Sequence, residues 1–155
     1  MKKVLILFGG LAALTAAYSC KRDNTATPVV TPSPTRLTAT LTAPTTSTAT
    51  SVTASGAFAG AVSQTTNALS YTVTFTGITP TAITMDPVSA TGTAPASFTL
   101  TGPNSTTTAL TSPYSGTTTL TTSQATGLIG GAYQVNLRST DSPDGALRGT
   151  VTQQP

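Results

Sequence analysis

The chain of 155 residues has no histidine, tryptophan or glutamate, and it has a single cysteine. Without histidine it lacks the usual general base, the commonest metal ligand and any Ser-His-Asp or Cys-His catalytic arrangement. One cysteine excludes an internal disulfide and a zinc site built from several cysteines. Only 7% of the residues are charged, which leaves little material for paired-carboxylate catalysis. We therefore expect a protein that is not an enzyme and that needs no cofactor.

Basic charge is also scarce in the part of the chain that is expected to fold. The formal net charge is +3, but Lys2 and Lys3 belong to the first few residues. Beyond them, five lysines and arginines stand against four aspartates, which leaves +1. Nucleic-acid binding relies on clustered lysine and arginine, and the sequence has no such cluster. We expect no nucleic-acid partner.

The N-terminal residues predict export and attachment to a membrane. Lys2 and Lys3 precede an apolar run and then small residues up to Ser19, which is the order of a secretory signal. The run is shorter than the roughly 20 apolar residues that a membrane span needs. Cys20 follows directly, in a setting that resembles the lipobox of bacterial lipoproteins. We predict a signal peptide over residues 1–19 and lipidation of Cys20; the alternative is a plain signal peptide with an unmodified cysteine.

Residues 20–35 are predicted to be a tether. Three prolines lie there among threonine, serine and other polar residues, a composition typical of an extended spacer that packs against nothing. A domain over residues 36–155 would follow. With Cys20 as the anchor, the membrane is the first predicted partner, and the predicted location is the cell envelope. We expect the outer membrane, with the domain facing the periplasm or the surface.

From residue 36 onward, apolar and polar residues alternate. Runs at 69–76, 98–101, 133–138 and 147–152 place apolar residues at every second position, as in strands with one buried face. Threonine, with 38 copies, suits such strands because its branched Cβ fits a pleated sheet. Only 122–128 is expected to form a helical turn. We predict an all-β, antiparallel, Greek-key-like β-sandwich; the alternative is a low-complexity linker throughout.

Two stretches near the end of the chain carry a family resemblance. Residues 133–139 read YQVNLRS and residues 143–149 read PDGALRG. Together they resemble the C-terminal signature of the CHRD (chordin-type) domain, typically Y-V-N-V-H-T followed by P-x-G-E-I-R-G. Segments further upstream resemble the opening strands of that family, so the resemblance covers residues 36–153. The positions that match the signature are Asn136, Pro143, Gly145, Arg148 and Gly149.

The chain departs from the family at its histidines. The family usually has an A-H-I-H segment after its third strand, and on our alignment those histidines are replaced by Thr84 and Asp86. Arg138 replaces the histidine of N-V-H-T. If the family's histidines bind a metal, this chain has lost the site. We hypothesise that Asp86 and Arg138 form an ion pair in its place; the alternative is two unrelated exposed charges.

The remaining polar residues indicate structural roles rather than catalytic ones. If the last two strands pair, Arg148 lies beside Asn136 and Arg138, where a structural, hydrogen-bonding role is favoured over a ligand role. Asp141 and Asp144 in the intervening loop are a conceivable weak calcium site. The leading functional prediction is a structural or interaction module whose partner is an envelope protein or a glycan. The alternative is a small-ligand or metal-binding CHRD domain with an altered site.

Overall fold

The computed structural model describes residues 32–44, 53–88, 96–100 and 109–155, which belong to one compact unit, Thr31–Pro155. The predicted signal peptide and the predicted lipidation site Cys20 lie outside the described residues, as does most of the predicted tether. Within the described ranges, no helix is long and apolar enough to cross a membrane.

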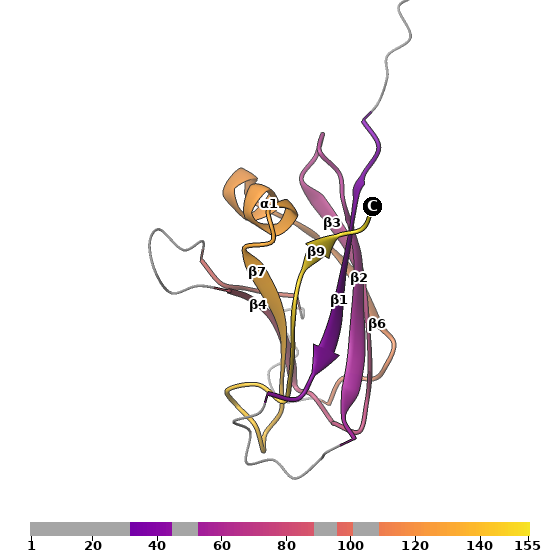
Figure 1. The fold of residues 1–155 in the computed structure, drawn as a ribbon, viewed down its shortest axis with the longest axis vertical. Helices are drawn as coiled ribbons and strands as arrows, with labels where there is room; N and C mark the ends of the chain where they lie inside the picture. The colour runs from indigo at the N-terminus through magenta and orange to yellow at the C-terminus, as the bar shows by residue number, and fades with distance from the viewer. Residues whose placement is uncertain (1–31, 45–52, 89–95, 101–108) are drawn as a thin grey trace, which may run out of the picture. The chain divides into compact units, whose positions relative to one another are not determined.

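In the described residues, nine strands form one sheet, and one helix lies beside it (Figure 1). In chain order the elements are β1 (Thr35–Thr42), β2 (Ser55–Val62), β3 (Ala68–Thr76), β4 (Ala82–Pro87), β5 (Phe98–Thr99), β6 (Tyr114–Thr119), α1 (Thr122–Ile129), β7 (Tyr133–Arg138), β8 (Leu147–Thr150) and β9 (Thr152–Gln153). The strand order across the sheet is β5-β4-β7-β8-β1-β2-β3-β6, with β9 beside β1.

The connections between the strands have Greek-key character. The chain leaves β3 to form β4 and β5, then returns to place β6 beside β3, and later places β7 beside β4. Strands β1, β2 and β3 also lie side by side in chain order, and β8 and β9 return by a long connection to lie beside β1, which is the arrangement of a Greek key. All the strand pairs in the described residues are antiparallel. The predicted all-β, antiparallel fold is confirmed, with the refinement that the two halves of the sandwich belong to one curled sheet. One half is β5-β4-β7-β8, and the other is β1-β2-β3-β6 with β9.

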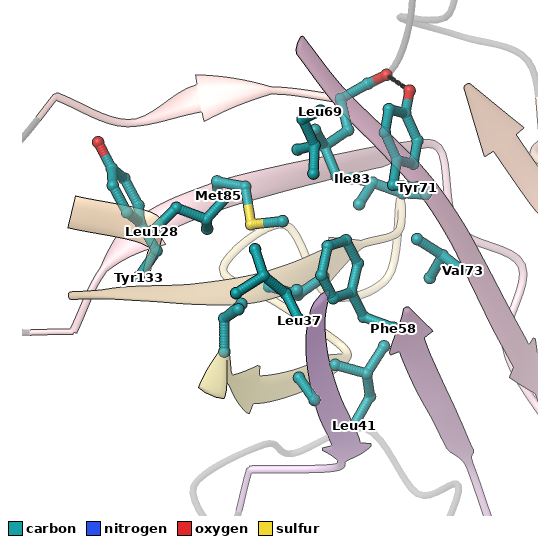
Figure 2. Packing of buried hydrophobic residues seen from close by; sticks show 14 of the residues in the cluster. Leu37, Leu41, Phe58, Leu69, Tyr71, Val73, Ile83, Met85, Leu128 and Tyr133 are labelled. Carbon is teal, nitrogen blue, oxygen red and sulfur yellow. Dashed lines mark hydrogen bonds between the residues drawn. The ribbon is translucent and has the colours of Figure 1, made fainter. Parts of the chain in front are cut away.

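Alternating side chains from both halves of the sheet form the core. In β1, Leu37, Ala39 and Leu41 are buried while the residues between them are exposed, and β3 repeats the pattern. These side chains pack with Phe58 of β2 and with residues of β4 and β7 in one cluster. Figure 2 shows Leu37 and Phe58 at the centre, with Met85 on one side and Val73 on the other. Burying apolar area in this way is the main favourable term in folding.

Tyrosine hydroxyls fix the segment around β5. Tyr71 of β3 donates a hydrogen bond to the carbonyl of Leu100 (Figure 2), and Tyr133 of β7 donates to the carbonyl of Ala96 at 3.1 Å. Because both tyrosine rings are buried, each hydroxyl needs such a partner. Burial raises the pKa of both hydroxyls, and in Tyr71 the neighbouring Tyr114 adds to the effect.

The predicted helical turn at 122–128 is confirmed as α1. Thr121 caps its N-terminus by accepting a hydrogen bond from the backbone N–H of Gln124, and the Gln124 side chain accepts one from the backbone N–H of Thr121. This reciprocal pair is a capping box. Ala125 and Leu128 form the buried face of α1, and the helix ends at Gly130.

The strand predicted at 147–152 is interrupted. The structure divides it into β8, which pairs with β7, and β9, which pairs with β1. Val151 lies between the two, fully buried, and its backbone N–H donates to the carbonyl of Tyr133. The alternation therefore predicted the burial of Val151 correctly. At that residue, however, the strand changes its pairing partner from β7 to β1.

Candidate functional site

The two halves of the C-terminal signature face each other across a hairpin. Strands β7 and β8 pair with Asn136 opposite Arg148, and β4 lies on the other side of β7 with Thr84 opposite Asn136. These three side chains therefore form a row across the outer face of the sheet. Asp86 and Arg138 flank the row on β4 and β7. We refer to these five residues as the polar cluster.

Asp86 and Arg138 form an ion pair within this cluster. Arg138 Nη2 lies 3.0 Å from Asp86 Oδ2, although the two residues are not opposite each other in the ladder. The hydroxyl of Thr84 lies between them. It accepts a hydrogen bond from Arg138 Nε at 3.3 Å and donates one to Asp86 Oδ2 at 3.2 Å. The three positions at which the family resemblance expects histidine thus form one hydrogen-bonded network.

Asn136 is the most deeply buried member of the cluster. The alternation of β7 predicts that it faces outward with Gln134 and Arg138, but only 2% of its surface is exposed. The reason is the loop after β7, which folds back over it. The Asn136 amide donates to Asp86 Oδ2 at 2.9 Å and to the carbonyl of Asp144 at 3.1 Å. One side chain therefore connects β4, β7 and the loop.

The carboxylate of Asp86 is held in its charged form. Burial on its own raises the pKa of this carboxyl, but hydrogen bonds from Asn136, Arg138 and Thr84 and the positive charge of Arg138 outweigh that effect. The net result is a pKa below the usual value for aspartate. A carboxylate that accepts several hydrogen bonds behaves in this way because the donors stabilise only the ionised form.

Both arginines of the cluster hold the turn that follows β7. Arg138 Nη1 donates to the carbonyl of Pro143 at 3.2 Å, and Arg148 Nη2 donates to the carbonyl of Asp144. Within the turn, the N–H of Gly145 donates to the carbonyl of Ser142 at 3.1 Å. The signature's proline, first glycine and arginine therefore all belong to one structure, a turn tied to the strands on either side.

Gly145 is required by two features of this turn. Its φ is +132°, a region that favours glycine. A Cβ on this residue would also lie 2.1 Å from Asn136 Oδ1 and 2.7 Å from Arg148 Nε. Within the described residues these are the two buried side-chain atoms without a hydrogen-bond partner. The missing side chain thus provides the space that the cluster fills.

Gly149 is required by a second close approach. A Cβ there would lie 2.1 Å from the carbonyl oxygen of Thr40 on β1. Since β8 and β1 are the neighbours that join the two halves of the sheet, any side chain at this position would push the halves apart. The last residue of the signature is therefore a packing residue.

The model of the CHRD domain family matches residues 37–151. The chain belongs to the CHRD family. This match includes the whole polar cluster and the turn. No curated protein and no solved structure matches the chain.

The CHRD domain has no evident metal site in its described part. There, no three histidine, cysteine, aspartate or glutamate side chains lie close enough together to hold a metal ion. Asp141 and Asp144, the conceivable calcium ligands, have exposed side chains, and the carbonyl of Asp144 already accepts from Asn136 and Arg148. The Asp86 Oδ2 oxygen likewise accepts hydrogen bonds from Thr84, Asn136 and Arg138.

A second surface of the CHRD domain is distinctive for its uniformity. The outward side chains of β1, β2, β3 and β6 are almost all threonine, serine or alanine. They are Thr38, Thr40, Thr42, Ser55, Ala57, Ala59, Ala61, Ala68, Ser70, Thr72, Thr74, Thr76, Ser115, Thr117 and Thr119. We call this set the threonine face. Among the described outward residues of these strands, Arg36 is the one that carries a charge.

Hydroxyl groups on the threonine face contact one another across the strands. Thr72 and Ser115 lie 2.9 Å apart, oxygen to oxygen, and Ser55 and Thr76 lie 3.3 Å apart. Because a hydroxyl has one hydrogen to donate and two lone pairs to accept with, such pairs keep hydrogen-bonding capacity for a third group.

Two contacts of the polar cluster could not be predicted from the sequence. The bridging role of Thr84 depends on the register between β4 and β7, which no local pattern specifies. The carbonyl of Asp144 is a backbone group, and a sequence does not say where a carbonyl points. The available signal was the Pro-Asp-Gly turn, which predicts a tight hairpin but not that it covers Asn136.

Proposed function

We propose that the chain is a lipid-anchored protein of the cell envelope whose CHRD domain is a non-catalytic structural or interaction module that contacts a glycan or another envelope protein. The observation that carries this proposal is the threonine face. It offers neutral hydrogen-bond donors and acceptors over four neighbouring strands, together with small methyl groups. A partner suited to such a surface is itself neutral and rich in hydroxyl or amide groups.

The polar cluster supports a structural role. Asp86 and Arg138 bind each other and groups of their own chain, and Asn136 is covered by the turn. A general acid or base usually has a pKa near the working pH, whereas the pKa of Asp86 is lowered. This arrangement favours a structural role in which the polar cluster holds neighbouring strands together.

Sedimentation with an insoluble envelope glycan tests the interaction. The probe is purified peptidoglycan, and the protein is the full mature chain. We expect the wild-type chain to sediment with the glycan and Thr74→Glu to remain in solution, because Thr74 lies within the face on β3. Thr126→Glu, exposed on α1 outside the threonine face, is the matched control and should sediment normally. Equal sedimentation of all three would argue against the threonine face as the contact.

Metabolic labelling tests the anchor. Cells that express the full chain are grown with radioactive palmitate, and the envelope fraction is examined for labelled protein. We expect label on the wild-type chain and none on Cys20→Ser, which should also leave the membrane fraction. Stable attachment needs more than one acyl chain, since each buried methylene contributes only about 0.8 kcal/mol. Unlabelled wild-type protein would support the plain signal peptide instead.

The altered ligand or metal site is tested separately, by melting the purified protein with zinc, copper or calcium. A ligand that binds only the folded state raises the melting temperature as its concentration increases. The proposed module should show no such shift. A saturable shift with one metal would favour the metal-binding alternative, and Asp86→Ala would then show whether the polar cluster is the site.

A further inference from the structure

The turn held by the polar cluster contains a chemically sensitive peptide bond. Of the four aspartates in the chain, only Asp144 is followed by glycine. An aspartate before glycine is the one that cyclises most readily, because glycine has no side chain to block the approach of its own nitrogen to the aspartyl side chain. The sequence PDG thus combines the family's turn with a site of spontaneous modification.

The reaction needs no partner other than water. The backbone nitrogen of Gly145 forms a bond to Cγ of Asp144 in its protonated, carboxylic acid form. The bond from Cγ to the hydroxyl oxygen breaks, and the hydroxyl group leaves as water with the amide proton. The product is a five-membered cyclic imide. Water then opens the ring, either at Cγ, which restores aspartate, or at the main-chain carbonyl, which gives isoaspartate. In isoaspartate the backbone runs through the former side chain.

The geometry of the turn opposes ring closure. The Gly145 N–H donates to the carbonyl of Ser142, Pro143 occupies the second position, and the φ of Asp144 is not positive. These features define a type I turn, in which ψ of the third residue is near 0°. The Gly145 nitrogen then lies about 120° of rotation away from the Asp144 side chain that it would have to attack.

The polar cluster prevents that rotation. Turning about the Cα–C bond of Asp144 moves the carbonyl oxygen and the Gly145 nitrogen together. That oxygen accepts hydrogen bonds from the Asn136 amide, at 3.1 Å, and from the Arg148 guanidinium. Asn136 is buried and is itself fixed by Asp86. Ring closure therefore requires the hydrogen bonds from Asn136 and Arg148 to break.

We infer that Asn136 and Arg148 hold the Asp144–Gly145 peptide in an unreactive conformation, and that Asp144 is a site of isoaspartate formation whenever the polar cluster opens. This role goes beyond the proposed interaction function and does not depend on it. It makes the chemical lifetime of the protein a property of the same contacts that join β4, β7 and β8.

The test is prolonged incubation of the full chain at neutral pH. Isoaspartate is measured by enzymatic methyl transfer with protein isoaspartyl methyltransferase, and its position is found by fragmentation mass spectrometry. The wild-type chain should react at Asp144 at least about tenfold faster when unfolded in urea than when folded. Asn136→Ala and Arg148→Ala should each raise the rate in the folded state about tenfold, the effect of losing one well-placed hydrogen bond on local opening.

Three controls make the result specific. Val73→Ala destabilises the core without touching the turn; if it raises the rate at Asp144 as much as Asn136→Ala does, global unfolding explains the reaction and the inference is wrong. Asp144→Glu must abolish the signal, because its ring would have one more atom and closes poorly. A folded wild-type chain that reacts as fast as the unfolded chain would also overturn the inference. Should Asn136→Ala fail to fold, Arg148→Ala carries the test, since Arg148 is only partly buried.

Discussion

Asp86 and Arg138 are bound by a shared set of partners rather than by charge alone. Thr84 bridges them, and Asn136 donates to the same carboxylate oxygen. The guanidinium is 39% exposed and the carboxylate 15% exposed, so water screens the pair in part. At the scale of single residues, the polar cluster therefore derives its strength from hydrogen-bond number as much as from Coulomb attraction.

A double-mutant cycle measures the coupling energy between Asp86 and Arg138. Asp86→Ala and Arg138→Ala should each destabilise the domain, and their coupling energy should be about 1 kcal/mol, given the partial exposure of the arginine. The measurement is the urea midpoint and slope of the four variants. Arg36→Ala combined with Asp86→Ala is the control, since Arg36 lies on β1 away from the cluster, and it should show no coupling. A coupling energy near zero for Asp86 and Arg138 would mean two independent charges.

The lowered pKa of Asp86 predicts acid sensitivity. The folded state holds this proton less tightly than the unfolded chain, whose aspartates have a pKa of about 3.9. The resulting stabilisation is complete above that value and is lost as the pH falls through the lower, folded-state pKa. In urea titrations from neutral to acidic pH, the stability gap between the wild type and Asp86→Asn should be largest at neutral pH and should narrow in acid. A gap that is constant over this range would contradict the prediction.

Gly145→Ala should be among the most damaging small substitutions. The added Cβ would clash with the Asn136 and Arg148 side chains, and the alanine would have to adopt a φ of +132°. We therefore expect a loss of about 3 kcal/mol in the free energy of unfolding. Gly131→Ala is a matched control. Its φ is also positive, at +75°, but its Cβ would meet nothing closer than 3.5 Å, so it should cost only about 1 kcal/mol. Equal losses would show that backbone strain, not the clash, dominates.

At the scale of elements, α1 is a helix of eight residues, too short to be stable on its own. Its capping box and the burial of Ala125 and Leu128 therefore have to supply the stability that the helix lacks on its own. Thr121→Ala should therefore destabilise the domain by about 1 kcal/mol, measured by urea unfolding. Ser123→Ala, an exposed change inside the helix, should be close to neutral. A loss at Ser123 as large as that at Thr121 would show that the cap does not contribute.

The elements differ in how well the sequence predicts them. Strands β3 and β7 have large apolar side chains at every second position, and both were predicted to within a residue. Strand β6 was not predicted, because Tyr114 is its only large apolar residue and its pairing with β3 depends on backbone groups. The ion pair was anticipated because two opposite charges replace histidines in a chain poor in charge. The burial of Asn136 was not, because it depends on the path of a loop.

At the scale of the whole molecule, one core serves both halves of the sheet. Phe58 is completely buried within the cluster that unites them, so Phe58→Ala should cost about 4 kcal/mol. Because the core is shared, amide hydrogen exchange should show β3 and β7 losing protection together. Protection that persists in one half alone would mean that the two halves unfold separately.

Strand β1 has a mechanical position that follows from its pairing. It is the first strand after the predicted tether, and it is aligned with β2 over eight residue pairs. If the proposed lipid anchor holds the N-terminus, tension on the tether would enter at Thr35 and run along the strand axis. A partner held on the threonine face would resist from β2 and β3, so the load would shear the ladder, whose hydrogen bonds then have to break together rather than one after another. Strand β1, which lies between β8 and β2 in the sheet, would thus be the strand that bears force between the proposed anchor and the proposed partner.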